Sequence, residues 1–142
     1  QTMSSSELAN FLLSRDSAAY DSKEDITWQD MTRPLCEYFI SSSHNTYLVG
    51  GQLKGDSTPE GYIRALQQGC RCVELDVWDG NEGQPVVYHG RTFTSKILLS
   101  EALAAIKKYA FVATPFPLIL SVEVHCDMAQ QAIMATQLKE IL

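Results

Sequence analysis

Short, almost entirely apolar runs alternate along this chain with longer segments in which apolar residues recur at helical spacing. Strands without polar alternation are typical of a parallel sheet that helices cover on both faces. The sequence therefore predicts an α/β fold. The expected strands are 36–43, 70–78, 85–89 and 118–124, and the expected helices are 57–68, 100–113 and 128–142.

One junction does not fit a simple parallel sheet. The second and third expected strands are separated only by the turn 79–84. A parallel crossover needs a dozen or more residues, usually including a helix. Either this connection is a hairpin, or a parallel barrel is locally distorted there.

Charge and composition exclude several classes of protein. The chain has 142 residues, enough for one ordinary domain, and 17 acidic residues outnumber 11 basic ones, for a net charge of −6. This balance argues against nucleic acid as a partner, and against adhesion of this segment alone to an anionic membrane. No apolar run approaches the roughly 20 residues that span a bilayer. The four cysteines lack zinc or redox spacing, which favours reduced, packed cysteines in a cytosolic protein.

The first part of the chain has a different character. Residues 4–16 are predicted to form a short amphipathic helix, in which Ser4 and Glu7 have the spacing of a capping box. Residues 17–33 are polar and indicate a linker. The sequence starts at Gln1 and stops at Leu142 within a helical pattern, so we expect an excerpt of something longer.

Polar side chains gather where the expected strands end. The first strand leads into His44 and Asn45, the third into His89, and the fourth carries Glu123 near its end. The second strand contains Glu74 and Asp76, which alternation places on one face. In a parallel α/β sheet these ends meet at one rim, where ligands bind.

Two adjacent carboxylates in an apolar strand require a positive partner, since like charges in a low dielectric are costly. The oxygen-bearing candidates are Asn45, Glu74, Asp76 and Glu123. Oxygen ligands suit calcium or magnesium, and we favour calcium because it tolerates an irregular cage of protein oxygens. Zinc, which would recruit the histidines, is less suited to this set.

The three histidines receive different interpretations. His44 and His89 are left for proton transfer and charge stabilisation beside the oxygen cage. His125 is interpreted as structural, because strand alternation is expected to turn it away from Glu123.

Four ordered segments together resemble the X region of eukaryotic phosphoinositide-specific phospholipase C. They read ISSSHNTYL, RCVELDVWDG, VVYHGRTFTSKI and LILSVEVHC. The resemblance covers residues 29–142, a truncated X domain. Residues 1–28 resemble, more weakly, the end of the family's EF-hand region and a linker.

The resemblance implies the N-terminal half of a distorted TIM-like barrel, whose C-terminal Y half and phosphate-binding lysines lie beyond Leu142. It implies calcium-dependent cleavage of phosphatidylinositol bisphosphate, a lipid at a membrane surface, to diacylglycerol and inositol trisphosphate in intracellular signalling. It also implies a cytoplasmic protein that is peripheral at membranes.

The resemblance also assigns roles residue by residue. Asn45, Glu74, Asp76 and Glu123 match the family's calcium ligands, and His44 and His89 match its catalytic histidines. Glu74, or alternatively Glu123, would take the proton from the inositol 2-hydroxyl, His44 would stabilise the phosphorane, and His89 would protonate the leaving diacylglycerol oxygen. The product of this first step is a cyclic phosphodiester, which water then opens.

Two other functions stay open at this point. One is a different metal-dependent phosphodiesterase of the glycerophosphodiester class, which also pairs an E-x-D strand with a histidine. The other is a catalytically silent inositol-phosphate binder, although the presence of both His44 and His89 favours catalysis. We further expect residues 1–142 alone to be neither stably folded nor active, because an open half-barrel leaves strand edges unpaired.

Overall fold

The computed structural model describes residues 3–18 and 27–142, which fall into two compact units, Gln1–Tyr38 and Phe39–Leu142. In its described residues, the first unit holds helix α1 (Ser5–Leu12) and two 3-10 turns, Arg15–Ser17 and Leu35–Glu37. Ser4 and Glu7 form the predicted capping box. The linker predicted over 17–33 falls partly outside the described residues, so its boundary stays a prediction.

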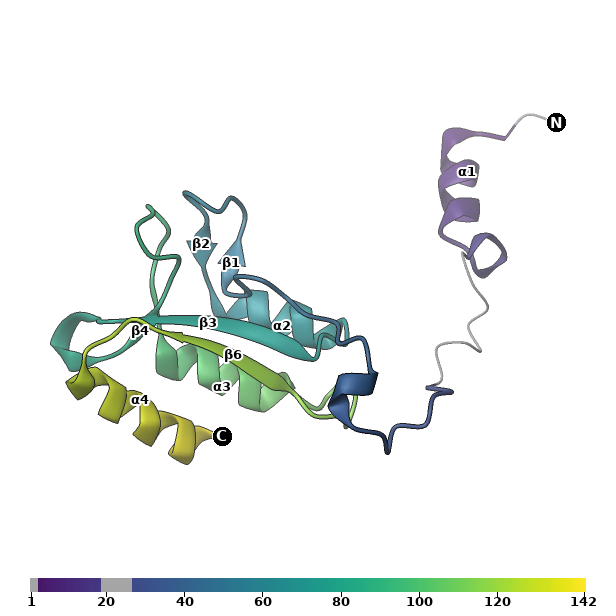
Figure 1. The fold of residues 1–142 in the computed structure, drawn as a ribbon. Helices are drawn as coiled ribbons and strands as arrows, with labels where there is room; N and C mark the ends of the chain where they lie inside the picture. The colour runs from purple at the N-terminus through teal and green to yellow at the C-terminus, as the bar shows by residue number, and fades with distance from the viewer. Residues whose placement is uncertain (1–2, 19–26) are drawn as a thin grey trace. The chain divides into compact units, whose positions relative to one another are not determined.

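The second unit is built on a four-stranded sheet in the order β5-β4-β3-β6 (Figure 1). Its two long strands, β3 (Cys72–Trp78) and β6 (Ile119–Val124), run parallel at the positions where the sequence predicts strands. The short strands β4 (Val86–Val87) and β5 (Ile97–Leu98) add antiparallel pairs. The turn at 79–84 therefore makes a hairpin, the first of the two alternatives that the sequence leaves open.

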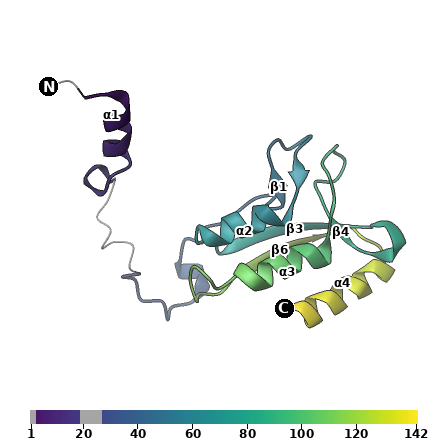
Figure 2. The same ribbon diagram turned by 180° about the vertical axis from the view of Figure 1, so that it is seen from behind.

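Three helices pack against one face of this sheet (Figure 2). They are α2 (Pro59–Gln67), α3 (Leu99–Tyr109) and α4 (Met128–Ile141), each with both ends within four residues of the predicted bounds. The core lies between these helices and the apolar face of β3. Its β3 members are Val73, Leu75 and Val77, which alternate with the polar residues of the opposite face. The chain is thus mixed α/β, as predicted, and the strands described here form an open sheet, not a closed barrel.

A second, smaller sheet was not predicted. Strands β1 (Leu48–Val49) and β2 (Asp56–Ser57) form an antiparallel pair. The backbone N–H of Thr58 donates to the Tyr47 carbonyl at 2.8 Å, so the loop 50–55 leaves and returns beside the segment 45–47. This pair holds the residues around Asn45 in place.

Two expectations about strands are wrong. The segment 36–43 is not a strand: residues 35–37 form a 3-10 turn, and only Ser42 makes an isolated parallel bridge, to Cys72. Strand β6 is not buried on both faces either, since Ile119 is 37% and Val124 45% exposed. The reason is that β6 is an edge strand among the residues described, with β3 on one side only.

The cysteines follow their prediction in part. All four are free. Cys70 and Cys126 are buried like small hydrophobic residues, whereas Cys36 is exposed. No helix in the described part of the chain is long and apolar enough to cross a membrane.

Candidate active site

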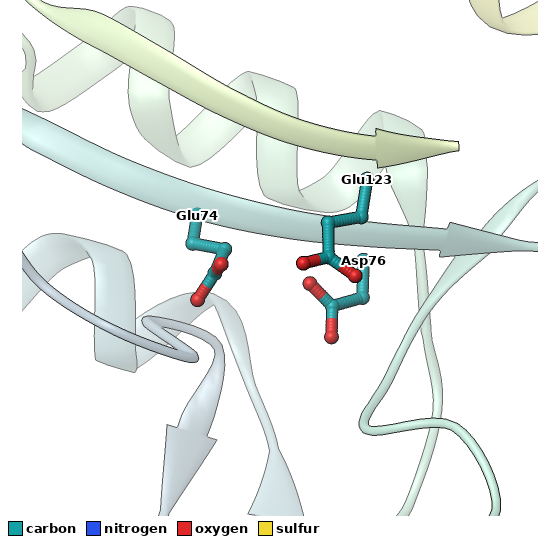
Figure 3. Close-up of side chains that lie close together, drawn as sticks. All are labelled: Glu74, Asp76 and Glu123. Atoms are coloured by element: carbon teal, nitrogen blue, oxygen red, sulfur yellow. The ribbon is translucent and has the colours of Figure 1, made fainter. Parts of the chain in front are cut away.

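Three carboxylates come together on the sheet face that the helices leave free. The parallel register sets Asp76 directly beside Glu123, and Glu74 lies two residues before Asp76 on the same face of β3. One carboxylate oxygen from each of the three lies within 4.8 Å of the others. Figure 3 shows the three side chains pointing to the same side of the two strands. The sequence prediction that Glu123 joins the Glu74–Asp76 pair is therefore met by the geometry.

Each of these carboxylates accepts one hydrogen bond from a different donor. The donors are the backbone N–H of Asn45 to Glu74 Oε2 at 2.6 Å, the hydroxyl of Tyr47 to Asp76 Oδ2 at 2.7 Å, and Nε2 of His125 to Glu123 Oε2 at 2.9 Å. One oxygen of every carboxylate is thus fixed by the chain. Among the described residues, the second oxygen of every carboxylate has no hydrogen-bond donor and is left for another partner.

Asp76 is the carboxylate that most requires such a partner. Only 7% of the residue is exposed, and its Oδ1 is buried without a hydrogen-bond donor. Burial raises the pKa of Asp76, the Tyr47 hydroxyl opposes this by lowering it, and the charges of Glu74 and Glu123 raise it further. A hard cation bound by these oxygens would give Asp76 Oδ1 a partner and would offset the repulsion among the three carboxylates. The residues present therefore fit such an ion.

Asn45 joins the carboxylates through its backbone conformation. Its φ is +46°, a left-handed conformation that Asn tolerates better than most residues. The side-chain Nδ2 donates to Gln52 Oε1 at 2.7 Å, which turns Oδ1 toward the hydroxyl of Tyr47 at 2.8 Å. Because the same hydroxyl contacts Asp76, the amide oxygen of Asn45 lies beside the carboxylate cluster, as predicted for a ligand.

His44 and His89 line the same cavity as the four oxygen-bearing residues. This cavity has a volume of about 380 Å³ and is also lined by Trp78, Gly90, Arg91 and His125. Nδ1 of His89 lies 2.8 Å from the Gln52 carbonyl, which can only accept, so this nitrogen carries a proton. Nε2 of His89 is then the nitrogen that is free to gain or lose a proton. All six predicted site residues therefore meet in one place.

The six site residues do come together, but the expected reason is wrong. They do not all lie at the ends of parallel strands. Glu74 and Asp76 lie within β3, and His89 follows β4, which runs antiparallel to β3. The hairpin returns the chain along β3, with the Tyr88 N–H directed at the Asp76 carbonyl at 3.4 Å. It is this return that brings His89 alongside the carboxylates.

The predicted orientation of His125 is wrong. Residues two apart in extended backbone lie on the same face, and the His125 N–H still donates to the Val77 carbonyl at 2.8 Å, so the strand geometry continues past β6. The imidazole therefore lies beside Glu123, not away from it. Its ring also stacks on Trp78, with centroids 4.2 Å apart and planes at 16°.

Several residues of the site were missed in the sequence. Tyr47, fully buried, has its hydroxyl within hydrogen-bond distance of both Asn45 and Asp76 and donates its single proton to one of them at a time. Burial raises the pKa of this hydroxyl, which keeps the proton on the donor. Gln52 orients Asn45 and His89 from the loop 50–55. The spacing Glu123-x-His125 was a signal for His125, whereas no pattern in the sequence pointed to Gln52.

A family model, curated relatives and solved structures match this chain. The family model for the phosphatidylinositol-specific phospholipase C X domain matches residues 31–142. A curated relative from Xenopus laevis, 1-phosphatidylinositol 4,5-bisphosphate phosphodiesterase delta-4, is 56% identical over 132 residues. A human relative, 1-phosphatidylinositol 4,5-bisphosphate phosphodiesterase gamma-2, is 53% identical over 136 residues.

The chain is a small part of these relatives in length. The delta-4 match covers 93% of this chain and 17% of that protein. The gamma-2 match covers 95% of this chain and 11% of that protein. A solved structure, that of S. officinalis PLC21, superposes with a TM-score of 0.83 at 40% identity, over 95% of this chain and 17% of that one. With the family model matching most of its length, the chain belongs to the phosphatidylinositol-specific phospholipase C X-domain family.

Proposed function

We propose that this chain carries the calcium-binding and acid–base groups of a phosphodiesterase that cleaves phosphatidylinositol bisphosphate. The products would be diacylglycerol and inositol trisphosphate. The observation that carries the proposal is the single cavity that joins the three carboxylates with His44 and His89. The relatives named above are phosphodiesterases of this lipid, which supports the substrate class.

Asn45, Glu74, Asp76 and Glu123 would hold the ion, which we propose is calcium. All four offer oxygen, and calcium accepts irregular cages of several protein oxygens. When bound, calcium would lower the pKa of the inositol 2-hydroxyl and offset negative charge on the phosphoryl group. The histidines are not needed as ligands in this arrangement and are free for proton transfer.

The carboxylate of Glu74 would act as the general base in the first step. It takes the proton of the 2-hydroxyl as that oxygen bonds to phosphorus and the bond to the diacylglycerol oxygen breaks. Its Oε2 is fixed by the Asn45 N–H, which leaves Oε1 for this proton. Glu123 is the second candidate for this role, since its Oε1 is also left open by the hydrogen bond at Oε2.

His89 would supply the proton that the departing diacylglycerol oxygen needs. Because Nδ1 donates to the Gln52 carbonyl in both the neutral and the cationic ring, proton exchange is confined to Nε2. His44 would donate a hydrogen bond to the phosphoryl oxygens as negative charge builds on them. In the second step, a water molecule gives His89 a proton and opens the cyclic phosphodiester, and Glu74 returns its proton to the 2-oxygen.

This proposal places the protein at a cytoplasmic membrane surface, where the lipid lies. We expect the contacts to the ring phosphates to come from the rest of the full-length protein, including the Y half of the barrel. The cavity described here is lined by three carboxylates and a single arginine, Arg91, too few positive charges for a bisphosphate headgroup.

The identity of the products tests this function. Full-length protein is incubated with phosphatidylinositol bisphosphate, with buffered calcium or with a chelator, and the products are separated by chromatography. The proposal predicts diacylglycerol together with cyclic and acyclic inositol trisphosphate, in the presence of calcium only. Release of a glycerol phosphate without any cyclic product would favour a glycerophosphodiesterase and overturn the proposal.

A further inference from the structure

Glu123 is the least constrained of the three carboxylates. Its side chain is 55% exposed, whereas Asp76 is buried and Glu74 is half-buried. Glutamate side chains lose considerable rotamer freedom when they are fixed in one geometry. In the described part of the chain, the donor that fixes Glu123 is Nε2 of His125, at 2.9 Å from Oε2.

His125 is itself held on two sides. Its backbone N–H donates to the Val77 carbonyl at 2.8 Å, which anchors the residue to β3. Its ring stacks on the indole of Trp78, 4.2 Å between centroids and nearly parallel. An imidazole with both backbone and ring fixed presents Nε2 in one direction.

The indole of Trp78 links this histidine to the other side of the cavity. A Cβ atom at Gly90, directly after His89, would overlap the Trp78 ring, so only glycine allows this close approach. Tyr88 packs on the same indole, with ring centroids 5.6 Å apart. Trp78 therefore contacts both the segment that carries His89 and the residue that holds Glu123.

We propose that His125 is a positioning residue for the cation site. Its Nε2–H holds Oε2 of Glu123 so that Oε1 faces the common centre with Glu74 and Asp76, and Trp78 is the platform that fixes the imidazole. The inference rests on the proposed function, because it concerns the same ion. It adds a group that touches neither the ion nor the substrate and acts through Glu123.

The alternative is a purely structural role for His125, in which the imidazole matters only as a flat ring that covers Trp78. His125→Phe keeps a ring on the indole and removes the donor. His125→Gln removes the ring and keeps an N–H donor at a similar distance from the backbone. The two variants therefore separate donation from packing.

The test measures calcium binding directly, not activity. Full-length wild type and both variants are titrated with calcium in a calorimeter at the same pH. Asp76→Asn serves to identify the part of the signal that belongs to this site. Melting curves in chelator establish that each variant is folded, and His125→Met replaces His125→Phe if the latter does not fold.

We expect His125→Phe to weaken calcium binding at this site by about 10- to 100-fold, the usual effect of losing a group that orients a metal ligand. His125→Gln should stay within a few-fold of wild type. Wild-type affinity in His125→Phe, or equal losses in both variants, would overturn the positioning role while leaving the proposed function intact. A wild-type protein without any calcium signal at this site would instead overturn the proposed function, and this inference with it.

Discussion

The hydroxyl of Tyr47 contacts two of the proposed ligands at once, Asp76 Oδ2 at 2.7 Å and Asn45 Oδ1 at 2.8 Å. It is a fully buried phenol whose pKa is raised, so it stays a neutral donor. Removal of this donor would leave a buried carboxylate oxygen without a partner, which typically costs about 1–3 kcal/mol or more. The geometry of the ion site thus depends on an uncharged residue as well as on its ligands.

We predict that Tyr47→Phe weakens calcium binding by about 10-fold or more, because Asn45 and Asp76 lose their shared contact. Calorimetric titration of the full-length protein measures this change. Tyr62→Phe is the matched control, since Tyr62 is equally buried but donates to the backbone carbonyl of Glu74 at 2.8 Å. Similar calcium affinities in the two variants would contradict the role given to Tyr47.

The two proposed catalytic histidines should matter for turnover more than for folding. We predict that His44→Ala or His89→Ala lowers the turnover of phosphatidylinositol bisphosphate by about 10²–10⁴-fold, the usual contribution of a positioned acid–base group. Neither side chain belongs to the hydrophobic core, so melting temperatures should change little. Near-normal turnover in either variant would remove that histidine from the mechanism.

The repulsion among the carboxylates predicts an effect of pH on the calcium-free protein. Burial, together with Glu74 and Glu123, raises the pKa of Asp76 above its ordinary 3.8, so the folded state holds this proton more tightly than the unfolded state does. Stability is therefore lost as the pH rises through the raised pKa. Asp76→Asn removes the charge that causes this loss.

We expect Asp76→Asn to melt at a higher temperature than wild type in chelator, with a wider gap at pH 8 than at pH 4, which is close to the ordinary pKa of 3.8. The same variant should gain no stability at this site from calcium. Thermal melting with and without chelator at both pH values checks this. An Asn variant that melts below wild type at pH 8 would show that the Asp76 charge is not destabilising in the free protein.

At the scale of elements, helix α2 sets the position of the loop that carries Asn45. Gly61 in α2 lies against the backbone of Thr46, and a Cβ atom there would overlap the Thr46 carbonyl oxygen. The Thr46 hydroxyl in turn accepts from the Glu74 N–H at 3.0 Å. The helix, the loop and β3 are therefore in direct contact next to the site.

We predict that Gly61→Ala lowers the free energy of unfolding by about 1–3 kcal/mol, since overpacking exceeds the gain of up to about 1 kcal/mol in helix propensity. Calcium affinity should fall as well, because Asn45 moves with Thr46. Gly51→Ala is the control, as a Cβ atom at Gly51 meets nothing within 4 Å. Chemical denaturation and calcium titration measure both effects, and a Gly61→Ala protein as stable as Gly51→Ala would contradict the close contact.

The longer elements were predictable from the sequence, and most of the short ones were not. Strands β3 and β6 and helices α2–α4 carry clear apolar patterns, and the two strands carry Glu74, Asp76 and Glu123. Strand β4 lies within the predicted strand 85–89, whereas β1, β2 and β5 are two residues long each and have no periodicity to detect. The apolar segment 36–43 has a strand-like composition, but it pairs with β3 only at Ser42, a long-range contact that composition does not encode.

The carboxylates and histidines of the site were predicted from the sequence, but the residues that hold them in place were not. Carboxylates and histidines in apolar surroundings are conspicuous in a sequence. Tyr47, Gln52 and Trp78 are ordinary residue types, and their roles appear only when the hairpin and the loop 50–55 are placed in space. The orientation of His125 follows from strand geometry that continues past β6 and places residues 123 and 125 on one face.

At the largest scale, the second unit, Phe39–Leu142, is an open sheet with helices on one face and an acidic cavity on the other. The outer edge of β6 is unpaired among the residues described, and Ile119 and Val124 on it are partly exposed. Both features suit part of a larger barrel in which further strands extend the sheet. That residues 1–142 alone are unstable and inactive stays a prediction.

The central claim is that Asn45, Glu74, Asp76 and Glu123 together bind calcium on this face. The most direct measurement is the position of the ion in crystals of the full-length protein grown with calcium, located in an anomalous difference map. The account predicts a peak between the three carboxylates, with oxygens of all four residues at about 2.3–2.6 Å, the usual calcium–oxygen distance. A peak elsewhere in the molecule, with none at this position, would contradict it.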